Sequence, residues 1–257
     1  MNRVKIAFVF AVAAALCGCG PCGKKAAAPT LSPGEEVLTE AVKGWQVGQW
    51  CTYRLTSAGG KKSEVTVSLT GSENKPGGDR FWLEVVADRG GEKVITKALV
   101  PQLERVTFLT GAKDLTKDSE RLIIKVRNEP AIELPIRELK LAQQIQEKLG
   151  QGPDLNEIFG GGEGVTSRED AVVPYETLAG KKVTCRKIVL SKEGRDVGFA
   201  YGSDDVPIFG IAYSEHEGGK LELVDYGSSG ATSLINEEPQ KLDFFDIAKE
   251  LKGIKIK

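Results

Sequence analysis

The chain has 257 residues, with 35 Lys and Arg against 36 Asp and Glu, so its formal net charge is −1. Such a balance gives no excess of positive charge. We therefore expect the protein to bind neither nucleic acid nor an anionic membrane surface by electrostatic attraction. A single histidine also leaves little material for a catalytic triad or a histidine-bearing metal site.

Residues 1–18 have the organisation of a secretory signal peptide. Arg3 and Lys5 precede an uncharged apolar run from residue 6 to residue 16, and small residues follow it. This run is shorter than the ~20 residues that a membrane-spanning helix needs, and Lys24 and Lys25 prevent its extension. The pattern therefore predicts export of the chain from the cytoplasm.

Two cleavage sites are compatible with this leader. Cleavage after Ala28 would make Pro29 the first mature residue, which usually blocks that reaction. The alternative, which we prefer, is Leu16-Cys17-Gly18-Cys19, a sequence that resembles the bacterial lipobox. The resemblance implies a diacylated Cys19, usually with a third chain on its amine. One chain alone would hold a protein on a membrane only marginally, so we expect this anchor to be permanent. Gly20 stands where an Asp would favour the inner membrane, and it therefore favours the outer one.

Residues 19–43 are rich in Ala, Pro, Ser, Gly and charged residues and contain few large apolar ones. This composition predicts a lipid anchor followed by a flexible tether that faces the periplasm. The remaining residues 44–257 are enough for one substantial domain or two small ones. We prefer one domain, because neither half carries helices enough to cover a sheet of its own.

Alternation of apolar and polar residues predicts that this domain is mainly β. Residues 64–69 are the clearest case, because Val65, Val67 and Leu69 would share one face of a strand. Similar patterns predict strands at residues 48–56, 80–88, 92–100, 104–109, 120–127, 182–191, 196–202, 206–215, 220–226 and 231–236. Short glycine-containing turns separate them, which indicates an antiparallel meander. We expect a large curved antiparallel sheet or a half-open barrel.

A helical insert is predicted at residues 135–164. Its main helix, residues 136–149, follows Pro135 and ends before Gly150, as helix boundaries often do. Shorter helices are predicted at residues 154–159 and 242–252, and helices are the expected cover for strand faces such as that of Trp82 and Val86. The glycine-rich residues 160–164 predict a hinge, with a gate over a cavity as the alternative.

Several short segments resemble the LolA/LolB-like superfamily of bacterial periplasmic proteins and lipoproteins. They are residues 44–50, 173–185, 205–210 and 222–227, and the resemblance covers about residues 44–236. It implies a half-open antiparallel barrel whose helix-lined concave side holds acyl chains in the carriers of that superfamily. The exposed apolar loop by which its membrane-anchored receptors handle cargo has no clear counterpart in this chain.

Cys51 and Cys185 are the two cysteines of the predicted domain, and they would form either a disulfide or two separate buried thiols. The three tryptophans would belong to the core or, as the alternative, line a ligand site. His216 lies among turn residues, and the pairs Asp204-Asp205 and Glu237-Glu238 lie beside turn signals, so we interpret all of them as solvated. We expect no catalytic residue, no metal site and no cofactor.

Two functions follow from these patterns. The first is a membrane-anchored, non-catalytic lipoprotein that binds a lipid or another apolar ligand in its concave sheet. The second is a structural or accessory envelope protein with a filled core, which acts through protein partners. A cavity between sheet and helices would favour the first, and a packed interior would favour the second.

Overall fold

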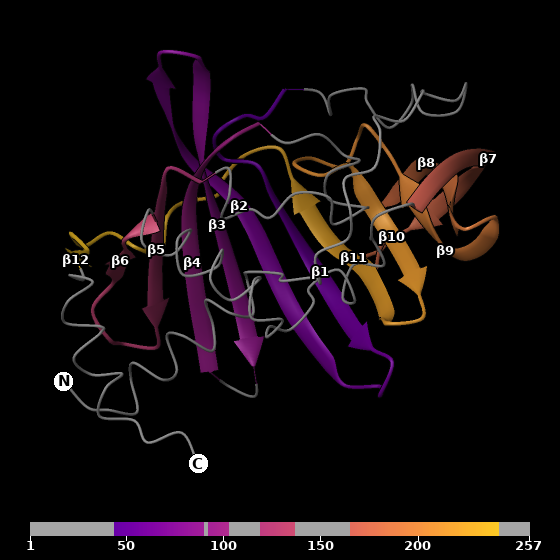
Figure 1. Cartoon of the computed structure of the whole chain (residues 1–257), viewed down its shortest axis with the longest axis horizontal. Coiled ribbons are helices and arrows are strands. Elements are labelled where there is room, and N and C mark those ends of the chain that lie inside the picture. The colour runs from indigo at the N-terminus through magenta and orange to yellow at the C-terminus, as the bar shows by residue number, and fades with distance from the viewer. Residues whose placement is uncertain (1–43, 90–91, 103–118, 137–164, 242–257) are drawn as a thin grey trace.

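The computed structural model describes residues 44–89, 92–102, 119–136 and 165–241. They form one open sheet of 12 strands in the order β12-β6-β5-β4-β3-β2-β1-β11-β10-β9-β8-β7; Figure 1 shows this order from left to right as far as β10, with β9, β8 and β7 overlapping at the right-hand end. The strands are β1 (Trp50–Ser57), β2 (Lys62–Lys75), β3 (Gly78–Arg89), β4 (Glu92–Pro101), β5 (Arg121–Val126), β6 (Ile132–Leu134), β7 (Val165–Glu176), β8 (Lys182–Lys192), β9 (Arg195–Gly202), β10 (Ile211–His216), β11 (Gly219–Gly227) and β12 (Gln240–Lys241).

The sheet consists of two meanders that meet side by side. Strands β1 to β6 pair in chain order, as do β7 to β11, and the antiparallel pair β1–β11 joins the two groups. The pairing of β12 with β6 is parallel, whereas the other pairings between the described strands are antiparallel. The prediction of a large, mainly antiparallel sheet is therefore confirmed, and the sheet is open, not closed into a barrel.

The main core lies on one face of this sheet. Val67 and Leu69 of β2 and Leu83 of β3 are at most 4% exposed and belong to one cluster that runs across both meanders. The face predicted for residues 64–69 is thus confirmed. Because side chains alternate along a strand, Trp82 and Val86 point to the opposite face, where a smaller cluster forms around Ile95, Ile123, Ala131 and Ile235.

An irregular segment, residues 228–241, covers this second cluster. It leaves β11, donates a hydrogen bond from the Ala231 nitrogen to the Gly48 oxygen (2.9 Å), and ends as β12 beside β6. Ile235, which is 5% exposed, is its contribution to the cluster. The prediction of a strand at residues 231–236 is therefore wrong, because these residues cross the strands and bond to them through side chains.

Other element predictions had mixed outcomes. Residues 206–210 are not part of a strand, since β10 begins only at Ile211, and β6 and β7 were not predicted as strands. The predicted strand at 104–109, the helices at 136–149, 154–159 and 242–252, and the glycine-rich residues 160–164 lie outside the described residues, apart from residue 136. No helix within the described ranges is long and apolar enough to cross a membrane.

The β7 end of the sheet curls back on itself. The turn after β7 donates hydrogen bonds from Leu178 and Ala179 to the carbonyl oxygens of Leu223 and Val224 in β11, at 3.2 and 2.9 Å. Four aromatic rings fill the bend, with neighbouring centroids 5.5 to 6.1 Å apart: Tyr175, Phe199, Tyr201 and Tyr213. This curl carries Lys181, in the same turn, from the sheet edge to the end of β11.

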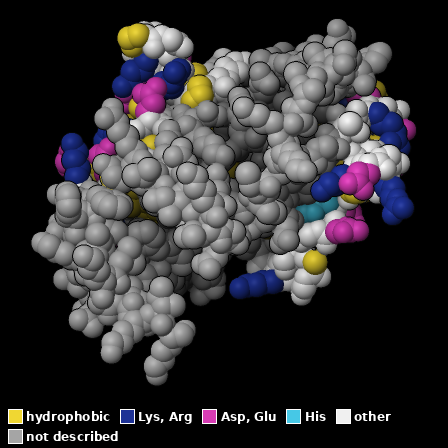
Figure 2. All heavy atoms as spheres, viewed as in Figure 1, with side chains coloured by type: hydrophobic (Ala, Val, Ile, Leu, Met, Phe, Trp, Pro, Cys, Tyr) yellow, Lys and Arg dark blue, Asp and Glu magenta, His cyan; other side chains and the backbone are white. Residues whose placement is uncertain are grey.

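The exposed edge of β7 is charged. Figure 2 shows Lys and Arg side chains mixed with Asp and Glu at the right-hand end of the molecule, where β7, β8 and β9 lie. Arg168 pairs with Asp196 and Lys187 with Asp170, each at 2.8 Å. Charges and a proline, Pro174, on an edge strand oppose pairing with another chain, so this edge is protected against aggregation.

Candidate functional site

The connection between β9 and β10 fills part of the core face of the sheet. Its residues Val206, Ile208 and Phe209 are at most 2% exposed and pack within the main cluster. The indole nitrogen of Trp45 donates to the Ile208 oxygen at 2.8 Å, and the Tyr53 hydroxyl donates to the Ile211 oxygen at 3.1 Å. Residues more than 150 positions away therefore fix the backbone of this connection.

Ile208 has a strained backbone. Its φ of 67° is rare for a β-branched residue, and the Phe209 nitrogen donates to the Pro207 oxygen at 2.9 Å, which is the pattern of a positive-φ γ-turn. The Cys51 thiol donates to the same Pro207 oxygen at 3.3 Å. Strain of this kind persists only where surrounding contacts over-determine the backbone, and it is concentrated at functional sites.

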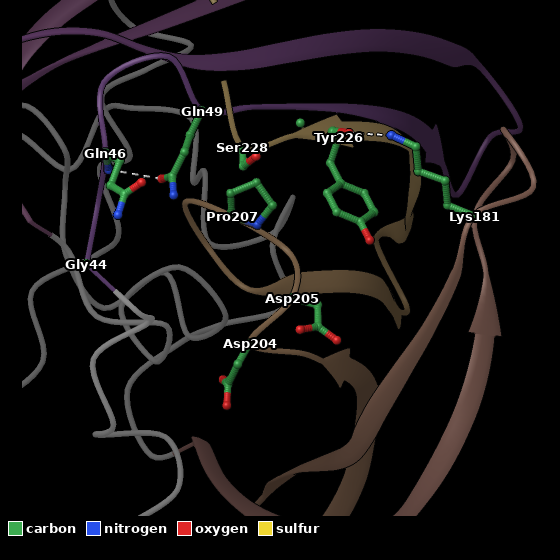
Figure 3. Close-up of a pocket in the computed structure, with 10 residues that line it drawn as sticks. Gly44, Gln46, Gln49, Lys181, Asp204, Asp205, Pro207, Tyr226 and Ser228 are labelled. Atoms are coloured by element: carbon green, nitrogen blue, oxygen red, sulfur yellow. Dashed lines mark hydrogen bonds between the residues drawn. The ribbon is translucent and has the colours of Figure 1, made fainter. Parts of the chain in front are cut away.

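A pocket of about 600 Å³ opens beside this turn. Four parts of the chain contribute to its wall: residues 44–49, the β7–β8 turn, the β9–β10 connection and the end of β11 (Figure 3). Its volume is in the range of about 300 to 1,000 Å³ that is usual for small-ligand sites. The lining residues are Gly44, Gln46, Gln49, Lys181, Asp204, Asp205, Pro207, Tyr226, Gly227 and Ser228.

Gln49 presents an amide nitrogen to the pocket. Its side-chain oxygen Oε1 accepts the backbone N–H of Gln46 at 3.2 Å, which fixes the orientation of the amide. The residue is only 8% exposed, and no acceptor for its Nε2 occurs within the part of the chain that the structure describes. The rest of this side chain is buried while its donor is open to the pocket, which favours a ligand that brings an acceptor.

The pocket carries more negative than positive charge. Asp204 and Asp205 are exposed on one side, and Lys181 is the cation on the other. Lys181 is already paired with Asp225 at 2.7 Å and donates to the backbone carbonyl oxygen of Tyr226 at 2.6 Å. Its Nζ also lies 4.8 Å from the centre of the Tyr226 ring. The hydrogen bond from Lys181 holds the pKa of Asp225 below its usual value, so the Asp225 carboxylate stays ionised and balances the charge of Lys181.

Cys51 and Cys185, the proposed disulfide pair, are both buried thiols and are not bridged to one another. Cys51 lies on β1 and Cys185 on β8, with β11, β10 and β9 between these strands in the sheet order. Burial raises the pKa of the Cys51 thiol to about 12. The disulfide alternative is therefore not what the structure shows, and the alternative of separate buried thiols describes both residues.

The three tryptophans have three different environments. Trp45 is in the core, with edge contacts to Phe81 and Phe209 at 5.5 and 6.4 Å between ring centroids. Trp82 is on the opposite face, where Lys97 and Arg121 lie 5.3 and 5.1 Å from its ring. Trp50 packs over Gly227 of the pocket, whereas Trp45 stands between the pocket residues Gly44 and Gln46 in the chain but has its ring in the core.

Other predicted residues do not converge on a site. His216 is at the β10–β11 turn, where its Nδ1 accepts the Gly218 N–H at 3.0 Å, and Glu237 pairs with Lys125 at 2.6 Å. No group of three or more potential metal ligands occurs within the described ranges. Sequence patterns missed Gln49, Lys181 and Tyr226, because nothing local marks residues that meet only through the curl of the sheet.

Comparison with known proteins gives little further information. No protein-family model and no curated protein matches the chain. One similar solved structure, described as an exported protein with a YmcC-like fold, comes from Bacteroides fragilis; it is 11% identical over 72% of this chain and 97% of that chain, with a TM-score of 0.28. Another, described as a lipoprotein, comes from Parabacteroides distasonis; it is 10% identical over 71% of this chain and 96% of that chain, with a TM-score of 0.30. At these values neither structure identifies a family or a function for the chain.

Proposed function

We propose that this protein is a lipid-anchored lipoprotein of the bacterial envelope, and that its β domain is a non-catalytic binding module which acts through protein partners. The observation that carries the proposal is the part of the core face that the β9–β10 connection fills. Val206, Ile208 and Phe209 occupy it beside β1, and hydrogen bonds from Trp45, Cys51 and Tyr53 hold them there.

A carrier of acyl chains needs a different interior. The resemblance to LolA/LolB-like proteins would imply an apolar cavity on the concave side of the sheet. The pocket beside the β9–β10 connection is instead lined by carboxylates, amides and a lysine, which match acyl chains poorly. The polar pocket and the packed core together support recognition of a polar partner over transport of lipid.

The expected anchor would keep this pocket near the membrane. Gly44, which lines the pocket, lies 25 positions (44 − 19) after Cys19. A flexible tether of that length has a root-mean-square span of about 25 to 30 Å and a fully extended reach of about 85 Å. Partners would therefore be proteins in or close to the same membrane, for which we propose the outer membrane.

The anchor is tested by Cys19→Ser in the full-length chain. We expect the variant to leave the membrane fraction for the soluble periplasmic fraction, whereas the matched variant Cys22→Ser stays with the membrane. Retention of a processed Cys19→Ser protein in the membrane fraction would contradict lipid anchoring at this residue.

The binding function is tested with the same full-length Cys19→Ser chain, exported and purified without detergent. Native mass spectrometry should give the mass of the bare protein, and a lipid-sized adduct that disappears on denaturation would favour a carrier instead. A photo-crosslinking residue at Ser228, in the lipidated protein in cells, should capture a protein that the same residue at Glu193, in the exposed β8–β9 turn, does not capture. Equal or absent capture at both positions would argue against a partner at the pocket.

A further inference from the structure

We infer that the pocket recognises a basic peptide segment, with a Lys or Arg side chain of the partner inserted between Asp205 and the rings of Pro207 and Tyr226. This inference rests on the proposed function and adds the chemical class of the partner. It follows from the charge, the donors and acceptors, the apolar surface and the rigidity of the pocket.

Charge selects a cation. Asp204 and Asp205 stand together on the β9–β10 connection, and the carboxylate of Asp205 has no hydrogen bond or ion pair with any described residue. The one cation of the lining, Lys181, is neutralised by Asp225 at 2.7 Å. An anionic ligand would therefore be repelled, whereas an ammonium or guanidinium group would find the Asp205 carboxylate as an acceptor.

The Gln49 amide selects a peptide over a simple amine or a metal ion. Its Nε2 donor is in a side chain that is more than nine-tenths buried, and it faces the pocket in Figure 3. A backbone carbonyl next to a basic residue supplies the acceptor that this donor needs, while the basic side chain supplies donors for Asp205. A bare cation supplies no acceptor and would leave Gln49 unsatisfied.

Apolar surface suits the stem of a long basic side chain. Pro207 lies in the middle of the pocket and the Tyr226 ring at its side. Asp205 lies on the side to which the hydroxyl end of that ring points (Figure 3). Lys and Arg side chains bury their methylene stems against such surfaces while the charged ends reach polar groups. An Arg would additionally stack on the exposed part of the Tyr226 ring.

The floor of the pocket is rigid. The strained turn at Ile208 is fixed by hydrogen bonds to Trp45 and Cys51, and it carries Asp205 and Pro207. Binding groups that are already fixed lose little freedom when a ligand arrives, which improves affinity for a short segment. The same rigidity fixes the spacing between Gln49 and Asp205. A ligand therefore binds both residues only if its acceptor and its cation are separated by a matching distance.

The test uses full-length protein in detergent micelles and fluorescein-labelled tripeptides, Ala-Arg-Ala and Ala-Lys-Ala, with blocked termini. Fluorescence anisotropy should show binding of both, with Ala-Gln-Ala and Ala-Glu-Ala weaker by about tenfold or more. Asp205→Asn should weaken Ala-Arg-Ala by about fivefold, the upper value for one exposed charge pair, and Asp204→Asn/Asp205→Asn should weaken it further. Raising the salt concentration should reduce binding by the wild type more than by the double variant.

Two controls separate the possible failures. Glu217→Gln removes an exposed carboxylate from the β10–β11 turn and should leave binding unchanged, and Gln49→Leu should weaken Ala-Arg-Ala while its circular dichroism stays native. Equal affinity for all four peptides, or an Asp205→Asn variant that binds as well as the wild type, would overturn the inference. The proposed function would still stand if crosslinking at Ser228 captures a protein, so the two failures are distinguishable.

Discussion

The carboxylate of Glu84 accepts the backbone N–H of Leu234 at 3.0 Å, although 150 positions separate the two residues. Glu84 is 1% exposed on the outer face of β3, and its second oxygen accepts the Ser233 hydroxyl at 2.8 Å. Lys97 donates to that hydroxyl at 2.7 Å, and burial lowers the pKa of Lys97 while Glu84 opposes the shift. Since a buried carboxylate is costly unless it is hydrogen-bonded, Glu84 fixes the position of residues 228–241.

Replacing Glu84 should therefore destabilise the whole domain. We expect Glu84→Leu to lower the free energy of unfolding by about 2 to 5 kcal/mol, because it leaves the Leu234 N–H and the Ser233 hydroxyl without their acceptor and Lys97 without a nearby opposite charge. Urea unfolding followed by circular dichroism measures this loss. Glu64→Gln, which breaks an exposed pair with Arg54, should cost less than about 1 kcal/mol. Similar losses in both variants would show that residues 228–241 do not depend on Glu84.

Ile208 should reverse the usual order of Ala and Gly. Ile208→Ala removes a fully buried side chain and should cost about 2 to 5 kcal/mol. Ile208→Gly leaves at least as large a cavity but relieves a positive φ that costs an L-residue about 1 to 2 kcal/mol. The greater conformational entropy of Gly in the unfolded chain lowers the stability of this variant by about 0.4 to 1 kcal/mol, which offsets only part of the strain that is relieved. In urea unfolding the Gly variant should therefore be the more stable of the two, and a more stable Ala variant would exclude strain at this turn.

Gly227 and Trp50 should be coupled. A Cβ on residue 227 would come within 2.8 Å of indole atom Cε2 of Trp50, which is its partner in the β1–β11 register. Gly227→Ala should cost about 1 to 3 kcal/mol in the wild type and less than about 0.5 kcal/mol in a Trp50→Ala background. Gly44→Ala is the matched control within the pocket, because nothing lies within 4 Å of its added Cβ. Additive losses in the double variant would mean that the indole is not what limits residue 227.

Alkaline pH should destabilise the protein through Cys51. Its pKa is raised from 9.0 to about 12 by burial, so the unfolded chain loses this proton first as pH rises. The thiol's contribution is intact below pH 9 and is lost progressively up to pH 12, with a slope of about 1.4 kcal/mol per pH unit between these values. Cys51→Ala should flatten the dependence of unfolding free energy on pH by that amount, in urea titrations from pH 8 to pH 11. Burial also raises the pKa of Tyr53, and Cys51 adds to that increase, so the part of the Tyr53 contribution that depends on Cys51 is lost with the same sign in Cys51→Ala. Parallel curves would contradict a protonated, buried thiol.

The strands could be predicted where a local pattern reports burial. In β2 and β3 one face is buried in the main core, and alternation of apolar residues along the chain follows directly from that geometry. Strand β7 has no such pattern. It is an edge strand whose side chains are mostly exposed, so apolar and polar residues do not alternate along it and its sequence does not predict a strand. Residues 231–236 resemble a strand in sequence, but only Ile235 packs against the sheet, in the second cluster, while Leu234 is exposed.

The sequence by itself was enough to recognise the mainly β, antiparallel meander and to predict a leader and a lipobox-like Cys19 motif, because each depends on residues within a few positions of one another. Only the tertiary structure decided that β11 pairs with β1, that the β9–β10 connection fills the core face, and that residues 228–241 cover the opposite one. The pocket is of the second kind. Gln49, Lys181, Asp205 and Tyr226 are far apart in sequence, and they meet because the β7–β8 turn bonds to β11 and Trp45 binds the Ile208 carbonyl across 163 positions. Such contacts depend on the order and curl of the strands, which no short stretch of sequence records.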